Sequence, residues 1–146
     1  MKDLKVRDLR PYETASKVDT KASMFTIVQE FIKNPSLHHL CVVDEQGKLL
    51  GLINRKRLFK SIFHHHIKTS ARVSELFSFA TAETSQDIML THVYATHEDE
   101  PLDKVIETMI EHNFREMPVL DEEGRVLGFV TLLIIMKKYL EYHPEM

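Results

Sequence analysis

The residues best suited to bind a ligand form a basic run, Asn54-Arg55-Lys56-Arg57, at the predicted start of a helix. Helix N-termini attract anions, so three cations are unfavourable there unless something negative lies nearby. Guanidinium groups bind phosphate oxygens well, often through two hydrogen bonds. The run therefore indicates a site for a phosphate-bearing ligand or an acidic partner surface, with a solvent-exposed basic turn as the alternative.

Histidines form the second group of chemically capable side chains. His64-His65-His66 are consecutive, and consecutive helical residues point about 100° apart, so their rings do not converge on one metal ion. Zinc sites use wider spacings, and the sequence predicts no metal site. A helix end exposed to solvent suits imidazoles because they favour the negative end of the helix dipole. His38-His39 precede a predicted core strand, where they face a cleft or cap a connector.

The sequence shows no recognisable set of catalytic residues. It contains no recognisable Ser/His/Asp set, nucleophile elbow or phosphate-binding glycine loop. Acidic residues and histidines are plentiful but scattered along the chain. We therefore predict no enzyme, no catalytic residue and no required cofactor.

The chain contains an internal repeat, and the basic run and the histidines are positioned by its structural elements. The segment Val42–Ile53 recurs as Val119–Val130 at an offset of 77 residues, with six of twelve positions identical. Such self-similarity indicates two copies of one small structural unit. One copy of about 60 residues buries little surface by itself, so we expect the two copies to form one module.

Each copy reads as strand, helix, strand, strand, helix. A β-prone run over 92–96 precedes Pro101, which suits the first turn of a helix. An Asp and a Gly begin and end a tight turn in both predicted hairpins. Gly51 and Gly128 occupy the same place in the second strand of each hairpin, which indicates a bulge or a close backbone approach. The apolar residues that support both helices of each copy recur in register: Met24, Ile27, Val28, Phe31 and Ile32 with Leu102, Val105, Ile106, Met109 and Ile110, and Leu58, Phe59, Ile62 and Phe63 with Ile135, Met136, Tyr139 and Leu140.

Composition limits the class of protein. The chain has 146 residues, 43% apolar content, 28% charge and a net charge of −3, which is typical of a soluble domain without a broad basic field for nucleic acid. The longest apolar stretch is too short to span a bilayer, and the first residues lack the hydrophobic core of a secretory signal. The single cysteine, Cys41, fits a reducing cytoplasm and a buried thiol. We expect a cytoplasmic protein with no membrane insertion and no nucleic-acid partner.

The motifs resemble those of the tandem cystathionine-β-synthase (CBS) domain pair. They are Ser85-Gln86-Asp87-Ile88-Met89, the segment 114–128 and its degenerate counterpart 40–51. The resemblance implies an α/β (α+β) fold of two β-α-β-β-α repeats related by a pseudo-twofold axis. We predict a first repeat over 1–66, a linker over 67–85 with a short helix near 73–77, and a second repeat over 86–146. In this family the clefts typically bind adenosine compounds such as AMP, ADP, ATP or S-adenosylmethionine, and the modules commonly dimerise and regulate another protein.

The chain departs from the family pattern where adenosine is usually held. Members that bind nucleotides often carry an Asp for the ribose hydroxyls, which here is replaced by Arg57 in the first repeat and Ile134 in the second. A buried ribose hydroxyl left unpaired costs on the order of 1–3 kcal/mol. We expect an anion-favouring first cleft and a more apolar second cleft. The predicted ligand-binding residues are Lys17, His38, Asn54, Arg55, Arg57, Val93, Tyr94, Arg115, Met117, Pro118, Thr131 and Ile134.

The sequence thus favours a regulatory module that senses an adenine nucleotide or a related adenosyl or anionic ligand and signals to a separate effector protein in trans. The alternative is a ligand-free interaction module with clefts filled by side chains. Both hypotheses include a homodimer, because Phe59, Ile62, Phe63, Tyr139 and Leu140 are predicted to form exposed apolar faces.

Overall fold

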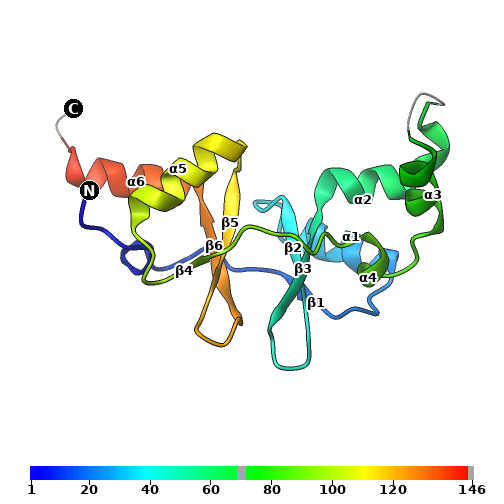
Figure 1. The fold of residues 1–146 in the computed structure, drawn as a ribbon, viewed down its shortest axis with the longest axis horizontal. Coiled ribbons are helices and arrows are strands. Elements are labelled where there is room, and N and C mark those ends of the chain that lie inside the picture. The colour runs from blue at the N-terminus through cyan, green and yellow to red at the C-terminus, as the bar shows by residue number, and fades with distance from the viewer. Residues whose placement is uncertain (69–71, 145–146) are drawn as a thin grey trace. The chain divides into compact units, whose positions relative to one another are not determined.

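Each copy of the repeat folds around a three-stranded mixed sheet. The computed structural model describes residues 1–68 and 72–144, and its elements are labelled in Figure 1. Packing groups Ser16–Val93 into one unit, the first-repeat unit, and Met1–Ala15 with the chain from Tyr94 onward into another, the second-repeat unit. The division by sequence into 1–66, 67–85 and 86–146 stays a prediction.

The first-repeat unit contains the predicted strand, helix, strand, strand and helix. Strand β2 lies between β1, to which it is parallel, and β3, to which it is antiparallel. The elements are β1 (Lys17–Val18), α1 (Met24–Lys33), β2 (His39–Val43), β3 (Leu49–Asn54), α2 (Arg55–Ile62), the 3-10 turn η2 (His64–His66), α3 (Val73–Thr81) and α4 (Ser85–Ile88). Helix α3 is the expected linker helix and extends four residues beyond the predicted end. Linker residues 69–71 lie outside the described residues.

The second-repeat unit has the same order and pairing. Strand β5 lies between parallel β4 and antiparallel β6. The elements are the 3-10 turn η1 (Val6–Leu9), β4 (Thr96–His97), α5 (Leu102–His112), β5 (Glu116–Leu120), β6 (Val126–Thr131) and α6 (Leu132–Tyr142). The first strand lies later than the predicted 92–96, because its pairing with β5 begins only at Thr96. The α/β fold of two β-α-β-β-α repeats is confirmed.

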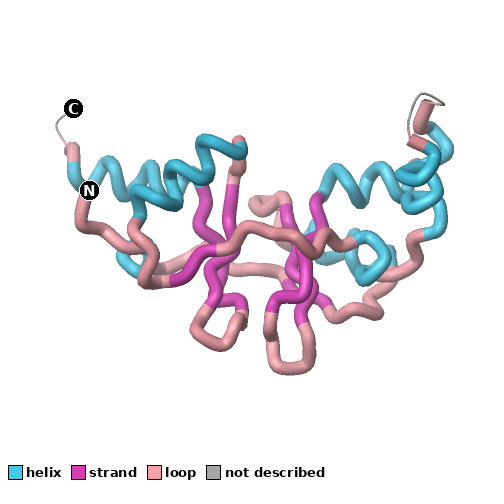
Figure 2. The backbone as a smooth tube through the Cα atoms, in the orientation of Figure 1, coloured by secondary structure: helices cyan, strands magenta, loops and turns pink. Residues whose placement is uncertain are grey.

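Turn chemistry explains the two hairpins, whose loops extend beyond the strands in Figure 2. Gly47 and Gly124 both have a φ of 83°, the conformation that favours glycine at the end of such a turn. The strand register shifts by one residue beside Gly51 and again beside Gly128. A Cβ atom at Gly51 would lie 2.7 Å from the Leu90 carbonyl oxygen, and one at Gly128 would lie 2.8 Å from that of Glu13. Both predicted features, bulge and close approach, are present in each repeat.

Each unit has its own apolar core. In the first-repeat unit Ile27 and Phe31 of α1 pack with Leu40, Ile53 and neighbouring side chains. In the second-repeat unit the core consists of Val6, Leu9, Leu102, Val105, Met109, Met117, Val119 and Val130. Two of these, Val6 and Leu9, come from the N-terminal segment, which explains why that segment packs with the second repeat. Cys41 is buried, as predicted for a core thiol.

Several helical faces remain exposed. Phe59, Ile62 and Phe63 of the first repeat and Tyr139 and Leu140 of the second are all exposed, as the sequence predicts. The homodimer inferred from them stays a prediction. Among the described residues, no helix has the length and apolar content needed to cross a bilayer.

Candidate functional site

Strand pairing brings two predicted binding residues of the second repeat to one end of its sheet. Thr131 ends β6 and pairs with Glu116, the residue after Arg115. The hydroxyl of Thr131 accepts a hydrogen bond of 3.2 Å from the backbone N–H of Ile134 and so caps α6. The backbone N–H of Leu132 donates to the Arg115 carbonyl over 3.1 Å. Arg115 and Thr131 therefore lie close together, beside the positive end of a helix.

Three aromatic rings gather beside this end of the sheet. The ring centroids of Tyr94 and His112 are 4.4 Å apart, and each lies 5.2 Å from that of Phe114. Tyr94 and His112 are exposed, whereas Phe114 is half-buried. Exposed aromatic faces bind planar rings such as nucleobases by stacking. Sequence analysis found Tyr94 but missed His112 and Phe114, although Phe114 directly precedes Arg115 in the recognised motif.

The predicted apolar residues of the second repeat are mostly part of its interior. Met117 is 3% exposed and belongs to the core, and Pro118 is buried as well. Ile134 is half-buried and packs against the same core. Val93 is half-buried and lies in the first-repeat unit by packing. A core residue is needed for folding whether or not a ligand touches it, so the binding role of these residues stays a prediction.

In the first repeat, Asn54 caps the helix that follows it. Its side-chain oxygen accepts hydrogen bonds from the backbone N–H groups of Lys56 and Arg57 over 2.9 and 3.3 Å. Its amide nitrogen lies 3.2 Å from Nε2 of His39. The cap satisfies two N–H groups that would otherwise attract an anion. The start of α2 thus has a neutral internal partner, the Asn54 side chain, and needs no negative group to satisfy these two N–H groups.

The two arginines of the basic run are held by the protein itself. Arg57 donates from Nε to the Ile88 carbonyl over 2.9 Å, and its guanidinium lies 5.1 Å from the Phe79 ring centroid. Arg55 donates to the carbonyls of Pro35, over 2.9 Å, and of Leu37, with its guanidinium 5.5 Å from the Phe31 ring.

These contacts correct one expectation from the sequence. The alternative given there to a ligand site was a basic turn exposed to solvent. In the structure Arg57 is half-buried and joins α2 to α3 and α4. Lys56 alone among the three cations is exposed. Their roles toward a ligand stay a prediction.

The other two predicted residues of the first repeat lie near the same strands. His38 precedes β2, and its carbonyl accepts a 3.0 Å hydrogen bond from the backbone N–H of Arg55. His38 is therefore adjacent to the start of α2. Lys17 is exposed on β1 and is paired with Cys41, farther along β2. The structure thus groups His38, Asn54 and Arg55 and leaves Lys17 at a different position on the sheet.

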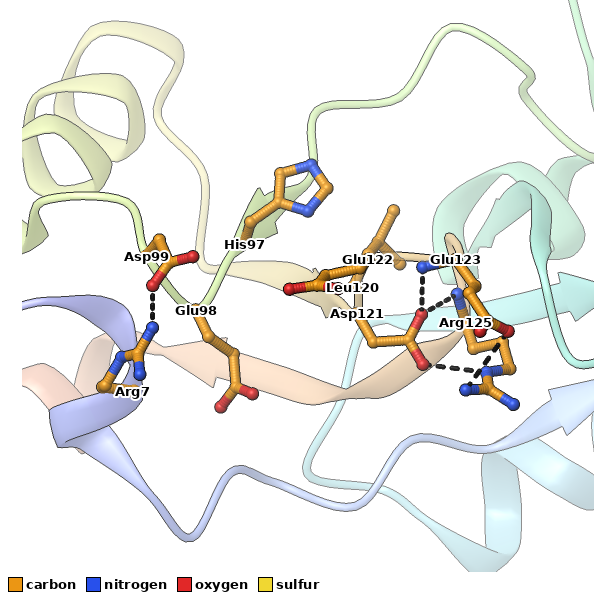
Figure 3. Close-up of a pocket in the computed structure, with 9 residues that line it drawn as sticks. All are labelled: Arg7, His97, Glu98, Asp99, Leu120, Asp121, Glu122, Glu123 and Arg125. Carbon is orange, nitrogen blue, oxygen red and sulfur yellow. Dashed lines mark hydrogen bonds and ion pairs between the residues drawn. The ribbon is translucent and has the colours of Figure 1, made fainter.

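A pocket of about 360 Å³ lies at the other end of the second-repeat sheet, beside the hairpin (Figure 3). Its lining is mostly charged: Arg7, His97, Glu98, Asp99, Leu120, Asp121, Glu122, Glu123 and Arg125. Arg7 forms an ion pair with Asp99, and Nε of Arg125 lies 2.8 Å from Asp121. Backbone and side-chain hydrogen bonds from Arg125 hold the pKa of Asp121 below its usual value. Within residues 1–68 and 72–144, no three metal-ligating side chains come together.

The sequence did not predict this pocket, because Arg7 is far from the other lining residues in the chain. Beside it, Glu98 accepts 2.6 Å hydrogen bonds from Nε of Arg10 and the hydroxyl of Tyr12. These bonds hold the pKa of Glu98 below its usual value. Burial, followed by the bond to Glu98, raises the pKa of Tyr12 to about 12. The network fastens the N-terminal segment to the second repeat.

Comparison with known families identifies the repeat. A family model described as the CBS domain matches residues 6–64 and again residues 85–141. The chain belongs to the CBS domain family. Strands β3 and β6, which are equivalent in the two matched regions, each form one bridge to a segment outside their own sheet: Leu52 pairs with Leu90, and Phe129 with Glu13.

Solved structures with the same fold include CBS domain pairs. The CBS pair of protein MJ0100, in complex with 5′-methylthioadenosine and S-adenosyl-L-methionine, is 28% identical and covers 94% of this chain and 97% of its own, with a TM-score of 0.70. A CBS-domain-containing protein from Thermotoga maritima is 26% identical, covers 94% and 95%, and has a TM-score of 0.73.

A curated relative, the L-aspartate semialdehyde sulfurtransferase of Methanocaldococcus jannaschii, is 33% identical over 96 residues. The match covers 66% of this chain but only 16% of that protein. The likeness to this relative therefore concerns a small part of its length.

Proposed function

We propose that this protein is a regulatory module that binds an adenosyl ligand and signals to a separate effector protein. The observation that carries the proposal is its likeness, over nearly the whole chain, to a CBS pair solved with 5′-methylthioadenosine and S-adenosyl-L-methionine. AMP, ADP and ATP are further candidates, since they share the adenosine group.

The exposed aromatic rings of the second repeat support recognition of an adenine base. The exposed faces of Tyr94 and His112 suit stacking of a purine, worth about 1–3 kcal/mol per base. The hydroxyl of Thr131 and the start of α6 provide polar groups at the same end of the sheet. In the first repeat, by contrast, both arginines already donate to backbone carbonyls. A phosphate there would have to replace those contacts.

The test is a thermal-shift and calorimetric titration with S-adenosylmethionine, 5′-methylthioadenosine, AMP and ATP. A ligand that binds the native state at 100 times its Kd should stabilise the protein by about 2.7 kcal/mol. Ribose 5-phosphate serves as the control that lacks a purine. Binding of the control with equal affinity would contradict recognition through the base.

A matched pair of variants locates the site. Tyr94 and Tyr142 are both 51% exposed, but only Tyr94 belongs to the aromatic group. Tyr94→Ala should weaken the adenosyl ligand by roughly tenfold or more, because a stacking contact is lost. Tyr142→Ala should leave the affinity unchanged. Equal effects of the two changes would remove Tyr94 from the site.

The second candidate function is that of a ligand-free interaction module. The observation that favours it is the extent of exposed apolar surface on α2 and α6. The same titrations separate the two candidates, since a pure interaction module gains no stability from any adenosyl compound. A homodimer is compatible with both functions, and light scattering at tens of micromolar measures it.

A further inference from the structure

A buried acid lies at the end of the second-repeat sheet where Arg115 and Thr131 come together. Glu116 begins β5 and is 5% exposed. Among residues 1–68 and 72–144, it is the single acidic or basic side chain that is buried. Its neighbour Arg115, by contrast, is exposed. Burial of a carboxylate costs free energy unless other groups stabilise its charge, so the position of Glu116 needs a physical reason.

Strand pairing places the Glu116 side chain beside the start of α6. Glu116 is directly opposite Thr131, and opposed residues of an antiparallel pair lie on the same face with Cβ atoms about 4.5–5.5 Å apart. The next residue, Met117, belongs to the core, so Glu116 points to the face away from that core. Thr131 is the N-cap of α6, and the dipole of a helix stabilises a carboxylate near its N-terminus. The start of α6 thus has an acid of this chain beside it.

The first repeat shows that side chains at these two positions reach each other. His39 and Asn54 are the equivalents of Glu116 and Thr131 at the offset of 77, and they pair in the same way. Nε2 of His39 lies 3.2 Å from the amide nitrogen of Asn54, whose oxygen caps α2. The charge beside the capped helix therefore differs between the repeats, with an imidazole in the first and a carboxylate in the second.

The aromatic rings connect Glu116 to the proposed site for the base. The ring centroids of Tyr94 and His112, whose exposed faces suit a purine, each lie 5.2 Å from that of Phe114. Phe114 is two residues before Glu116. Two residues of an extended chain span at most about 7 Å. A base stacked on these rings therefore leaves the rest of an adenosyl ligand within reach of the carboxylate.

A phosphate group at this end of the sheet would meet an unfavourable charge. Like charges repel, and the repulsion is stronger at a buried group because water screens it less. Arg115 and His112, which could attract a phosphate, are both exposed, so solvent screens their attraction. A neutral thioether or a cationic sulfonium at the 5′ position of the ligand meets no such repulsion.

We propose that Glu116 makes the second-repeat site select adenosyl compounds whose 5′ substituent carries no net negative charge. The preferred class then includes adenosine, 5′-methylthioadenosine and S-adenosylmethionine, whereas AMP and ATP bind more weakly. This inference rests on the proposed function, because it concerns the ligand of the same site.

Calorimetric titration with adenosine and AMP tests the proposal, because the two ligands differ only in the phosphate. In the wild type we expect adenosine to bind at least about tenfold more tightly than AMP. Glu116→Gln keeps the size of the side chain and removes its charge, so the ratio of the two affinities should fall at least about fivefold, mainly through tighter AMP binding. Glu122→Gln, which removes an exposed charge at the other end of the sheet, is the matched control and should leave the ratio unchanged. Affinities are counted for the binding step that Tyr94→Ala weakens, which assigns them to the second repeat.

The ratio of affinities distinguishes a role in selectivity from a role in folding. If Glu116→Gln binds both ligands more weakly and the ratio stays that of the wild type, the proposal is overturned. AMP that binds the wild type as tightly as adenosine would also overturn it, while leaving the proposed function in place. This comparison uses the wild type alone, so it decides against the proposal even if Glu116→Gln does not fold. If no adenosyl compound binds at all, the proposed function and this inference are both wrong.

Discussion

Replacing Arg57 by alanine removes two contacts that hold α3 and α4 against α2. The first is the 2.9 Å hydrogen bond from Nε to the Ile88 carbonyl, and the second is the contact with the Phe79 ring at 5.1 Å. A hydrogen bond from a charged group contributes about 1.5–3 kcal/mol, and Arg57 is half-buried, which favours the lower end. A cation–π contact of this exposure adds about 0.5–1 kcal/mol. We therefore expect a loss of about 2 kcal/mol in the free energy of unfolding.

The assay is urea denaturation followed by far-UV circular dichroism, with the slope of each transition compared among variants. Lys56→Ala is the matched control, since Lys56 is the exposed neighbour on the same helix, and it should change stability by less than about 0.5 kcal/mol. Arg57→Lys keeps the charge but loses the planar group that stacks on Phe79, so it should fall between wild type and alanine. Hydrogen exchange should rise mainly over α3 and α4.

Two results would refute this reasoning. If Arg57→Ala is as stable as Lys56→Ala, the contacts with Ile88 and Phe79 contribute nothing in solution. If Arg57→Ala loses stability but exchange over α3 and α4 is unchanged, the loss has another origin. In the first case a basic turn exposed to solvent, the alternative left open by the sequence, would be the better description of Arg57.

Three further predictions concern backbone, charge and capping. Gly128→Ala should lower the free energy of unfolding by at least about 2 kcal/mol, because Gly128 has a φ of +155° and a Cβ there would lie 2.8 Å from the Glu13 carbonyl oxygen. Gly124→Ala should lower it by about 1 kcal/mol, because Gly124 also has a positive φ but no atom lies near the added Cβ. Because the folded state lowers the pKa of Glu98, its carboxylate stabilises the protein above the ordinary value of 4.5 and loses that effect as the pH falls through the folded value. Glu98→Gln should therefore be less stable than the wild type at pH 7, and the difference should vanish in acid. Asn54→Ala should cost about 1–2 kcal/mol through loss of the helix cap.

Melting curves and urea titrations check all three, each with a distinct contradicting result. Equal costs for the two glycine substitutions would mean that the approach of the N-terminal segment to β6 is not tight. If Glu98→Gln remains less stable than the wild type in acid, the charge of the carboxylate is not the source of the difference in stability. An Asn54→Ala variant of wild-type stability would mean that water replaces the cap without cost.

The sequence predicted the fold because its signals are local and occur twice. An Asp three residues before a Gly predicts each hairpin, and apolar spacing predicts each helix, without knowledge of distant contacts. The exposed apolar faces of α2 and α6 followed from the same periodicity. The strand at Thr96–His97 was predicted slightly too early, since strand ends depend on pairing with β5 rather than on composition.

Long-range contacts explain what the sequence analysis missed. The partner groups of Arg57 are Phe79 and Ile88, which come from α3 and α4. Glu98 meets Arg10 and Tyr12, which lie near the start of the chain. No periodic pattern connects such pairs, so neither the role of Arg57 nor the charged pocket could be predicted. The structure places Arg115 close to Thr131, but the binding roles of both stay predictions.

The two positions that depart most from the family pattern are used in the same way in this chain. Arg57 and Ile134 are equivalent in the repeat, and each turns toward its own unit: Arg57 to Ile88 and Phe79, and Ile134 to the core. Neither side chain can accept a hydrogen bond from a ribose hydroxyl. Under the proposed function, we expect an adenosyl compound to be recognised through its base, by the exposed rings of Tyr94 and His112 rather than by the basic run at α2.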